Sequence, residues 1–343
     1  MAVIFPQWIK KNDLIEVIAP SDSAGNEIKK KRFENAKNNL KKRGYEILFG
    51  DNVFNESIKG RSDTAQKRAE EFMDAITNKD VKYIVSAGGG DFLCEILPYL
   101  DYNIIKENPK WFQGYSDNTG LTFSITTKTG IATVYGNNFG SYGMESWHKC
   151  VDENIRILEG HGVIQKSFNM YENEFHEEVT GLEGISNDKE VYYKGYRGGI
   201  EIEEMSIKGR LIGGCTDVIS DLAGTPYEDY LGFVDKNKED GIILYLESFN
   251  GNSEATFRIL WKLREMGWFE NVNGILIGRP MFEGSDYSIS YEEAVKYILG
   301  PLGINYVFGC DIGHKQPQFT MVNGAIGEFK LKNHKGELNL IYT

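Results

Sequence analysis

The stretch WFQGYSDN (111–118) decides the fold class, because an apolar run ends abruptly at Gly114 and gives way to Ser116 and two further polar residues. The stretch YIVSAGGG (83–90) has the same form, an apolar run that meets three glycines. Each run has the character of a short buried strand that leads through a turn into a helical segment. In open α/β sheets, ligands bind in the crevice beyond the carboxyl ends of the strands. We therefore expect both turns to lie at such an edge.

Outward from these stretches, the chain alternates short apolar runs with helical periods, which indicates βα units on largely parallel sheets. In the first half, strands are predicted at 14–19 and 45–49, and helices at about 28–42 and 65–76. In the second half, the predicted elements are strands at 207–214, 241–247, 274–278 and 305–310, helices at about 216–222 and 255–267, and a hairpin that turns at 333–336. We predict an N-terminal α/β domain over 1–165, a polar connection over 166–195 and a C-terminal domain over 196–343.

The composition excludes several classes of partner. The chain has 343 residues, 41% of them hydrophobic, which is enough for two globular cores. Its formal net charge of −12 disfavours nucleic acid and anionic membranes as partners. Neither a run of about 18 apolar residues nor a leader pattern is found, so we expect a cytoplasmic protein that does not enter the membrane. The four cysteines are widely spaced and are predicted to be reduced.

Ser116 is a candidate nucleophile. A serine on a sharp turn between a strand and a helix is exposed and lies near the backbone N–H groups of the helix start. The second glycine of the G-x-S-x-G pattern is missing, however, because Asn118 occupies that position. Taken alone, these residues favour the alternative that Ser116 and Asp117 merely cap a helix.

A serine nucleophile needs a base, and His314 is the best placed of the five histidines because it alone directly follows a strong strand pattern. Glu247 ends the apolar run GIILYLE (241–247), where it could accept a hydrogen bond from the second ring nitrogen of a histidine. The alternatives stay open at this point: a surface histidine, and a carboxylate at a strand end that faces water.

The glycine run 88–90 could bind a phosphate or supply backbone donors to an oxyanion. No phosphate-loop motif is present, and Asp91 adds a negative charge, so oxyanion donors are favoured over a phosphate site. A tight turn without function is the remaining alternative. Cys215 follows a second glycine pair, but no sequence neighbour would activate its thiol as a nucleophile.

Eight blocks in this order resemble the LD-carboxypeptidase and microcin C self-immunity family of serine peptidases over nearly the whole chain. These blocks are IAPSD (18–22), SAGGG (86–90), GYSDNT (114–119), YGNN (135–138), GRLIGGCTDVISDLAGTPY (209–227), LYLES (244–248), GILIGRP (274–280) and GCDIGH (309–314). The resemblance implies that Ser116 is the nucleophile, His314 the base and Glu247 the carboxylate that orients the base. It also implies oxyanion donors from the backbone of Asp117 and of Gly89 or Gly90, with no metal or cofactor.

The resemblance further implies a flavodoxin-like N-terminal domain, an active site in the cleft between the two domains, and a homodimer. The implied substrates are the amide of an aminoacyl-nucleotide toxin or, as the alternative, the LD-amide of a murein tetrapeptide. The loop lacks the R-G-G of the muropeptide enzymes, which favours the microcin self-immunity branch. Arg197, Arg279 and Tyr196 are candidates for substrate contacts. A rival hypothesis from another class is a non-enzymatic two-lobe protein that binds a small molecule.

Overall fold

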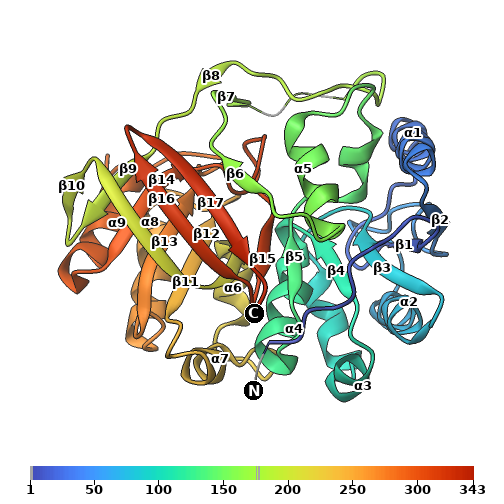
Figure 1. Cartoon of the computed structure of the whole chain (residues 1–343), viewed down its shortest axis with the longest axis horizontal. Helices are drawn as coiled ribbons and strands as arrows, with labels where there is room; N and C mark the ends of the chain where they lie inside the picture. The colour runs from blue at the N-terminus through green and yellow to red at the C-terminus, as the bar shows by residue number, and fades with distance from the viewer. Residues whose placement is uncertain (1–2, 175, 177) are drawn as a thin grey trace.

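The computed structural model describes residues 3–174, 176 and 178–343, which build two large β-sheets with helices packed around them (Figure 1). In spatial order, the six-stranded sheet contains β15 (Met321–Asn323), β5 (Thr133–Tyr135), β4 (Trp111–Gly114), β3 (Val81–Ser86), β1 (Leu14–Ile18) and β2 (Glu46–Phe49). Its five strands from the first half of the chain are parallel, and β15 is antiparallel to β5.

The second sheet has nine strands. In spatial order these are β10 (Ile200–Ile202), β9 (Lys194–Arg197), β14 (Asn305–Cys310), β13 (Val272–Gly278), β12 (Ile242–Glu247), β11 (Glu204–Cys215), β16 (Ile326–Lys332), β17 (Lys335–Ile341) and β6 (Ile164–Lys166). The four central strands, β14 to β11, are parallel, and their carboxyl ends carry the glycine pair, Glu247 and the loop to His314. A separate pair consists of β7 (Met170–Tyr171) and β8 (Lys189–Glu190).

The α-helices lie along both sheets. They are α1 (Glu27–Arg43), α2 (Ala65–Thr77), α3 (Tyr102–Glu107), α4 (Thr119–Thr129), α5 (Lys149–Leu158), α6 (Thr216–Leu222), α7 (Tyr230–Lys236), α8 (Ser253–Glu265) and α9 (Tyr291–Leu299). Short 3₁₀ turns add η1 (Leu93–Tyr99), η2 (Ser116–Asn118), η3 (Phe139–Gly143) and η4 (Gly300–Leu302). Local signals fix helix ends: the Asn26 side chain caps α1 by accepting from the Lys29 N–H, and Gly44, at φ 99°, ends it.

Helix α4 joins the two halves. It directly follows the turn at Ser116, and every residue of it except Lys128 is buried. Its Phe123 ring stacks on Trp268, at 5.7 Å between ring centroids, and Trp268 belongs to the second half of the chain. Because a helix that is buried all round packs on several neighbours at once, α4 fixes the serine turn relative to the second sheet.

Each half of the chain also completes the sheet of the other. Strand β6, from the first half, pairs with β17 at the edge of the nine-stranded sheet. Strand β15, from the end of the chain, pairs with β5 at the edge of the six-stranded sheet. The two chain ends lie side by side (Figure 1), and Phe5 packs on Tyr342 at 5.6 Å between ring centroids. The domain limits at 165 and 196 stay a prediction. Strand β6 extends across the first limit and β9 across the second.

The predicted class, α/β with parallel sheets, is confirmed. The strand predicted at 305–310 and the helix predicted at 216–222 have these bounds in the structure, and the hairpin turns at Asn333 and His334, both at positive φ. Seven short strands were not predicted, namely β5, β6, β7, β8, β9, β10 and β15. In the described part of the chain, no helix has both the length and the apolar character needed to cross a bilayer. All four cysteines are free thiols.

Candidate active site

Ser116 lies on the sharp turn that the sequence predicts, between β4 and the start of η2. Its φ of 66° is in the left-handed region, which a side chain other than glycine or asparagine seldom adopts. Asn118, which stands where the G-x-S-x-G pattern has its second glycine, stabilises the turn. Its Nδ2 donates to the carbonyls of Gly88 (2.9 Å) and Tyr115 (3.0 Å). Gly114 makes room for it, since a Cβ there would lie 2.7 Å from Asn118 Cβ. The turn is thus tied to the glycine loop.

Three side chains that are far apart in sequence meet in one hydrogen-bonded chain. The Nε2 atom of His314 lies 2.9 Å from Ser116 Oγ, and Nδ1 lies 2.8 Å from Oε2 of Glu247. Glu247 is at the end of β12, and His314 follows β14, two strands away in the same sheet. Two glycines allow this approach: a Cβ at Gly278 would lie 2.8 Å from Glu247 Cβ, and one at Gly313 would lie 2.4 Å from Glu247 Oε2.

Glu247 is fully buried, yet it is held in its ionised form. Burial alone would raise its pKa, but the nearby His314 and hydrogen bonds from His314, Tyr135 and Cys215 together lower the pKa below its ordinary value. A charged carboxylate beside Nδ1 keeps the proton on that nitrogen and leaves Nε2 free to accept one. The arrangement therefore supports a histidine that acts as a base toward Ser116.

Aromatic rings flank the histidine. The ring centroid of Tyr115 lies 5.2 Å from that of His314, and Phe249 lies 4.5 Å from it on ring centroids. Such contacts restrict the imidazole to one orientation and keep water from the His314–Glu247 hydrogen bond.

The glycine loop lies directly over the serine. A Cβ at Gly89 would come within 3.1 Å of Ser116 Oγ and 3.8 Å of the Asp117 nitrogen, so any larger residue there would press against the serine side chain. A Cβ at Gly90 would come within 2.4 Å of Ser21 Oγ. The N–H of Asp117 is in the first turn of η2, where helical N–H groups have no partner within the helix. Backbone donors thus stand close to the nucleophile, as an oxyanion site requires.

The side chain of Asp117 has a second task that the sequence did not reveal. Its Oδ2 accepts from Ser21 Oγ at 2.5 Å and from the Leu93 N–H at 2.9 Å. Burial raises the pKa of this carboxyl, and the two hydrogen bonds partly oppose that rise. Asp117 thereby holds two loops, one around residue 21 and one around residue 93, next to the turn at Ser116.

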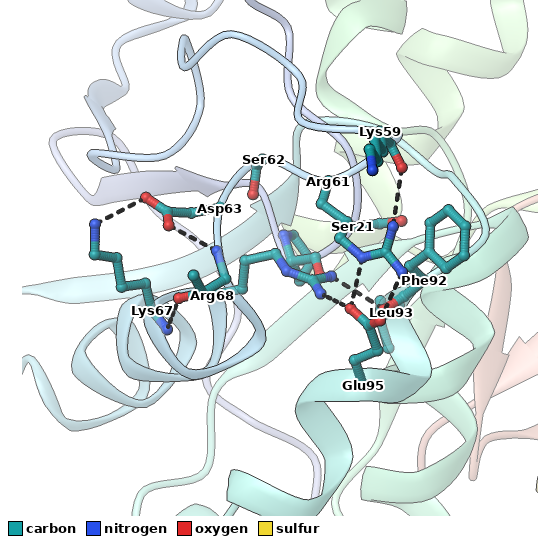
Figure 2. Close-up of polar contacts among 12 residues, drawn as sticks. Ser21, Lys59, Arg61, Ser62, Asp63, Lys67, Arg68, Phe92, Leu93 and Glu95 are labelled. Carbon is teal, nitrogen blue, oxygen red and sulfur yellow. Dashed lines mark hydrogen bonds and ion pairs between the residues drawn. The ribbon is translucent and has the colours of Figure 1, made fainter.

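A charged cluster supports the same two loops from outside (Figure 2). The fully buried Arg68 donates to the carbonyls of Pro20 (2.9 Å) and Phe92 (3.1 Å) and pairs with Glu95 at 2.6 Å. Arg61 pairs with the other oxygen of Glu95 at 2.6 Å, and its guanidinium lies 3.5 Å from the centroid of the Phe92 ring. These contacts tie Phe92, just after the glycine loop, to the loop at Pro20.

Three cavities are lined by residues of this site or by their neighbours in the chain. One of about 170 Å³ is lined by His314 and Tyr115 together with several glutamates of the 172–183 segment. A second, of about 300 Å³, borders Gly90 and Asp117, and a third, of about 480 Å³, borders Arg279. Within the described residues, no group of three His, Cys, Asp or Glu side chains is placed to hold a metal ion.

The three residues predicted to contact substrate have different surroundings. Arg279 is buried beside the third cavity, where it pairs with Asp311 at 2.7 Å and donates to two carbonyls. Arg197 and Tyr196 lie on β9 opposite Asn305 and Tyr306, at the amino end of β14. His314 follows the carboxyl end of that strand, so neither Arg197 nor Tyr196 is brought to the hydrogen-bonded chain. The sequence does not indicate the position of these two residues, because the antiparallel register of β9 depends on its pairing with β14.

Tyr135 is the residue at this site whose role the sequence did not suggest. Its hydroxyl donates to Glu247 Oε1 at 2.6 Å and accepts from the Ser116 N–H at 3.2 Å. The available signal was its position at the end of a strand and at the start of the block YGNN (135–138).

Comparison with known proteins identifies the family of this chain. The model of the LD-carboxypeptidase N-terminal domain matches residues 15–136, and that of the LD-carboxypeptidase C-terminal domain matches residues 208–329. A Treponema pallidum (strain Nichols) protein named "Putative carboxypeptidase" is 31% identical over 328 residues, which cover 93% of this chain and 90% of that protein. The Microcin C7 self-immunity protein MccF of Escherichia coli is 26% identical, over 86% of this chain and 84% of its own.

The solved structures agree as well. The crystal structure of an MccF-like protein from Bacillus anthracis str. Ames superposes with a TM-score of 0.81, at 26% identity, over 99% of this chain and 100% of that one. The two matched domains cover the nucleophile turn, the glycine loop, Glu247 and His314. This chain therefore belongs to the LD-carboxypeptidase family of serine peptidases.

Proposed function

We propose that this chain hydrolyses an amide bond in a small peptide-like substrate by acyl transfer, with Ser116 as the nucleophile. The observation that carries the proposal is the hydrogen-bonded chain from Ser116 Oγ through His314 to Glu247, with contacts of 2.9 and 2.8 Å. Nucleophile, base and orienting carboxylate in this order are the arrangement by which a serine hydroxyl is activated.

In the proposed reaction, His314 Nε2 takes the Ser116 proton while Oγ attacks the carbonyl carbon. The oxyanion accepts hydrogen bonds from the backbone N–H of Asp117 and of Gly89 or Gly90. The charge of Glu247 stabilises the imidazolium, which then protonates the leaving amine as the C–N bond breaks. Water, deprotonated by His314, attacks the acyl ester on Ser116 and releases the acid.

The substrate that we favour is an aminoacyl-nucleotide in which the aminoacyl group is joined through nitrogen. The support is similarity to MccF over most of both chains, together with the solved structure of MccF in complex with aspartyl sulfamoyl adenosine, which superposes with a TM-score of 0.80 at 24% identity. The second candidate is the terminal amide of a murein tetrapeptide. It is favoured by similarity to a Bacillus subtilis (strain 168) protein named "Probable murein peptide carboxypeptidase", which is 24% identical over 93% of this chain and 89% of its own length.

The test is the turnover of two probes by the parent chain and by Ser116→Ala. One probe is aspartyl sulfamoyl adenosine, with release of aspartate measured, and the other is a muramoyl-tetrapeptide, with release of its terminal amino acid measured. We expect the parent chain to cleave the first probe faster, and Ser116→Ala to lose at least about 10³-fold in kcat on either one. A folded Ser116→Ala variant with the full rate would refute the serine mechanism.

The parent chain in the same assay separates hydrolysis from the rival hypothesis of a non-enzymatic binding protein. Binding of the probe without turnover by the parent chain would favour that rival. We also propose that the protein acts in the cytoplasm as a homodimer, on the basis of the family resemblance. Sedimentation equilibrium of the purified chain measures the second point.

A further inference from the structure

The hydroxyl of Tyr135 lies between the nucleophile and the carboxylate of the candidate triad. Tyr135 is the last residue of β5, in the first sheet, and its side chain is fully buried. Its Oη is 2.6 Å from Oε1 of Glu247, which belongs to the second sheet, and 3.2 Å from the backbone nitrogen of Ser116. Within the described structure, His314 is the one other side chain that hydrogen-bonds to both Ser116 and Glu247.

The direction of both hydrogen bonds is fixed by chemistry. The Ser116 N–H can only donate, so Tyr135 Oη accepts there, and its single proton is left for Glu247. Burial, followed by the negative charge of Glu247, raises the pKa of Tyr135 well above its ordinary value. The phenol therefore stays protonated around neutral pH and donates to the carboxylate.

These contacts close a ring of four hydrogen bonds. The ring runs from Ser116 Oγ to His314, from His314 to Glu247, from Glu247 to Tyr135, and from Tyr135 back to the Ser116 N–H. It ties both oxygens of Glu247, one to the base and one to the tyrosine. It also holds the backbone of Ser116, whose φ of 66° is otherwise unfavourable.

We propose that Tyr135 is a positioning residue for this reaction, which sets the orientation of Glu247 and the strained backbone of Ser116 and withholds the Ser116 N–H from the oxyanion. The inference rests on the proposed function. It leaves the oxyanion to the donors of Asp117 and the glycine loop, unlike the serine peptidases in which the N–H of the nucleophile itself is a donor.

Tyr135→Phe removes the hydroxyl and keeps the ring. Glu247 then loses a charge-assisted hydrogen bond, and such bonds contribute enough that we expect kcat to fall about 10- to 100-fold. KM should change less than about twofold, because the Tyr135 side chain is fully buried. With its carboxylate less stabilised, the Glu247–His314 pair binds a proton more readily, so the acid limb of the kcat/KM profile should move to higher pH.

The other titratable groups that face Glu247 do not confuse this profile. They are Tyr115 from the nucleophile turn, Cys215 from β11 and Tyr291 from α9. Burial raises the pKa of each of them, that of Tyr115 to about 12. All three therefore stay neutral across the range in which the acid limb is measured.

The matched control is Tyr245→Phe. Tyr245 is also fully buried, its ring centroid is 5.7 Å from that of Tyr135, and its hydroxyl donates to Asn323 Oδ1 at 2.6 Å. Tyr245→Phe thus also removes a buried tyrosine hydroxyl close to Tyr135. The hydrogen bond that it removes does not involve Ser116 or Glu247. We expect Tyr245→Phe to keep kcat within about threefold and to keep the parent pH profile.

A second variant guards against a folding defect of Tyr135→Phe. Replacing Tyr135 with 3-fluorotyrosine keeps both hydrogen bonds and makes the phenol a stronger donor, so the acid limb should move to lower pH, opposite to the shift in Tyr135→Phe. Aspartyl sulfamoyl adenosine and the muramoyl-tetrapeptide serve as probes, and the faster one is used for the pH profiles. Circular dichroism and thermal unfolding confirm that each variant is folded.

The outcomes separate this inference from the proposed function. If Ser116→Ala keeps the full rate, the proposed function itself is refuted. If Ser116→Ala is inactive while folded Tyr135→Phe keeps kcat within twofold and the parent acid limb, only the positioning role is refuted. Equal losses in Tyr135→Phe and Tyr245→Phe, or acid limbs that move the same way in the phenylalanine and fluorotyrosine variants, would also overturn it.

Discussion

Glu16 should make the protein less stable as the pH rises from about 4.5 to about 7. It is buried in the middle of β1, only 8% exposed, and its Oε2 has no hydrogen-bond partner among the described residues. Burial, followed by the charges of Glu71, Asp74 and Asp51, raises its pKa from 4.5 to about 7, although Lys110 opposes this rise. A carboxyl with a raised pKa in the folded state binds its proton more tightly there than in the unfolded chain.

The sign and size follow from this difference. Between pH 4.5 and about 7 the folded chain holds a proton that the unfolded chain has lost, so the free energy of unfolding falls as the pH rises through this window. At about 1.4 kcal/mol for each pH unit, the full effect is at most about 3 kcal/mol. Glu16→Gln has the shape of the protonated carboxyl and cannot ionise. It should match the parent chain at pH 4.5 and be more stable than the parent at pH 8 by up to about 3 kcal/mol.

The assay is guanidinium unfolding of the parent chain and of Glu16→Gln at pH 4.5 and pH 8, with Glu46→Gln as the control. Glu46 is on the neighbouring strand β2 but is exposed, with 66% of its side chain accessible. We expect the control to differ little from the parent at both pH values. If the difference between Glu16→Gln and the parent were equal at the two pH values, or larger at pH 4.5, the reasoning would be refuted.

Three further predictions concern the site. Glu247→Gln places an amide where only donors point, so it must break one of the carboxylate's hydrogen bonds or impose the wrong histidine tautomer; kcat should fall about 10³- to 10⁴-fold, and a loss below tenfold in steady-state turnover would contradict this. Gly89→Ala adds a Cβ 3.1 Å from Ser116 Oγ and should lower kcat about 10- to 100-fold, whereas Gly88→Ala, which meets nothing within 4 Å, should leave it unchanged. Dialysis against EDTA should leave turnover within error of the untreated enzyme, because the proposed reaction uses side chains and backbone donors alone; a loss restored by a divalent metal would disprove that.

The sequence predicts well those features that depend on local pattern. The buried parallel strands appear as apolar runs, and glycine or polar residues mark where β3, β4 and β12 end. Since parallel strands place their carboxyl ends at one edge of a sheet, the positions of Glu247 and His314 at strand ends pointed to one edge of the second sheet, and that of Ser116 to the corresponding edge of the first.

Features that depend on pairing between distant segments could not be predicted in this way. Strand β15 has three residues and no pattern of its own, and it exists because its register with β5 buries it. Tyr135 looks like any aromatic residue of a strand, and its hydroxyl gains meaning only through Glu247, 112 positions later. The carboxylate of Asp117 resembled a helix cap, yet it accepts from Ser21, 96 positions earlier.

The exchange of β6 and β15 between the two sheets limits how the enzyme can move and how it can be divided. A hinge motion that separates the two halves would break backbone hydrogen bonds in both sheets at once, between β6 and β17 and between β15 and β5. We therefore expect a substrate to enter without separation of the two halves. Either half expressed alone would have a sheet that lacks one edge strand, and it would carry only part of the candidate triad. We therefore expect both halves to be needed in one chain for folding and activity.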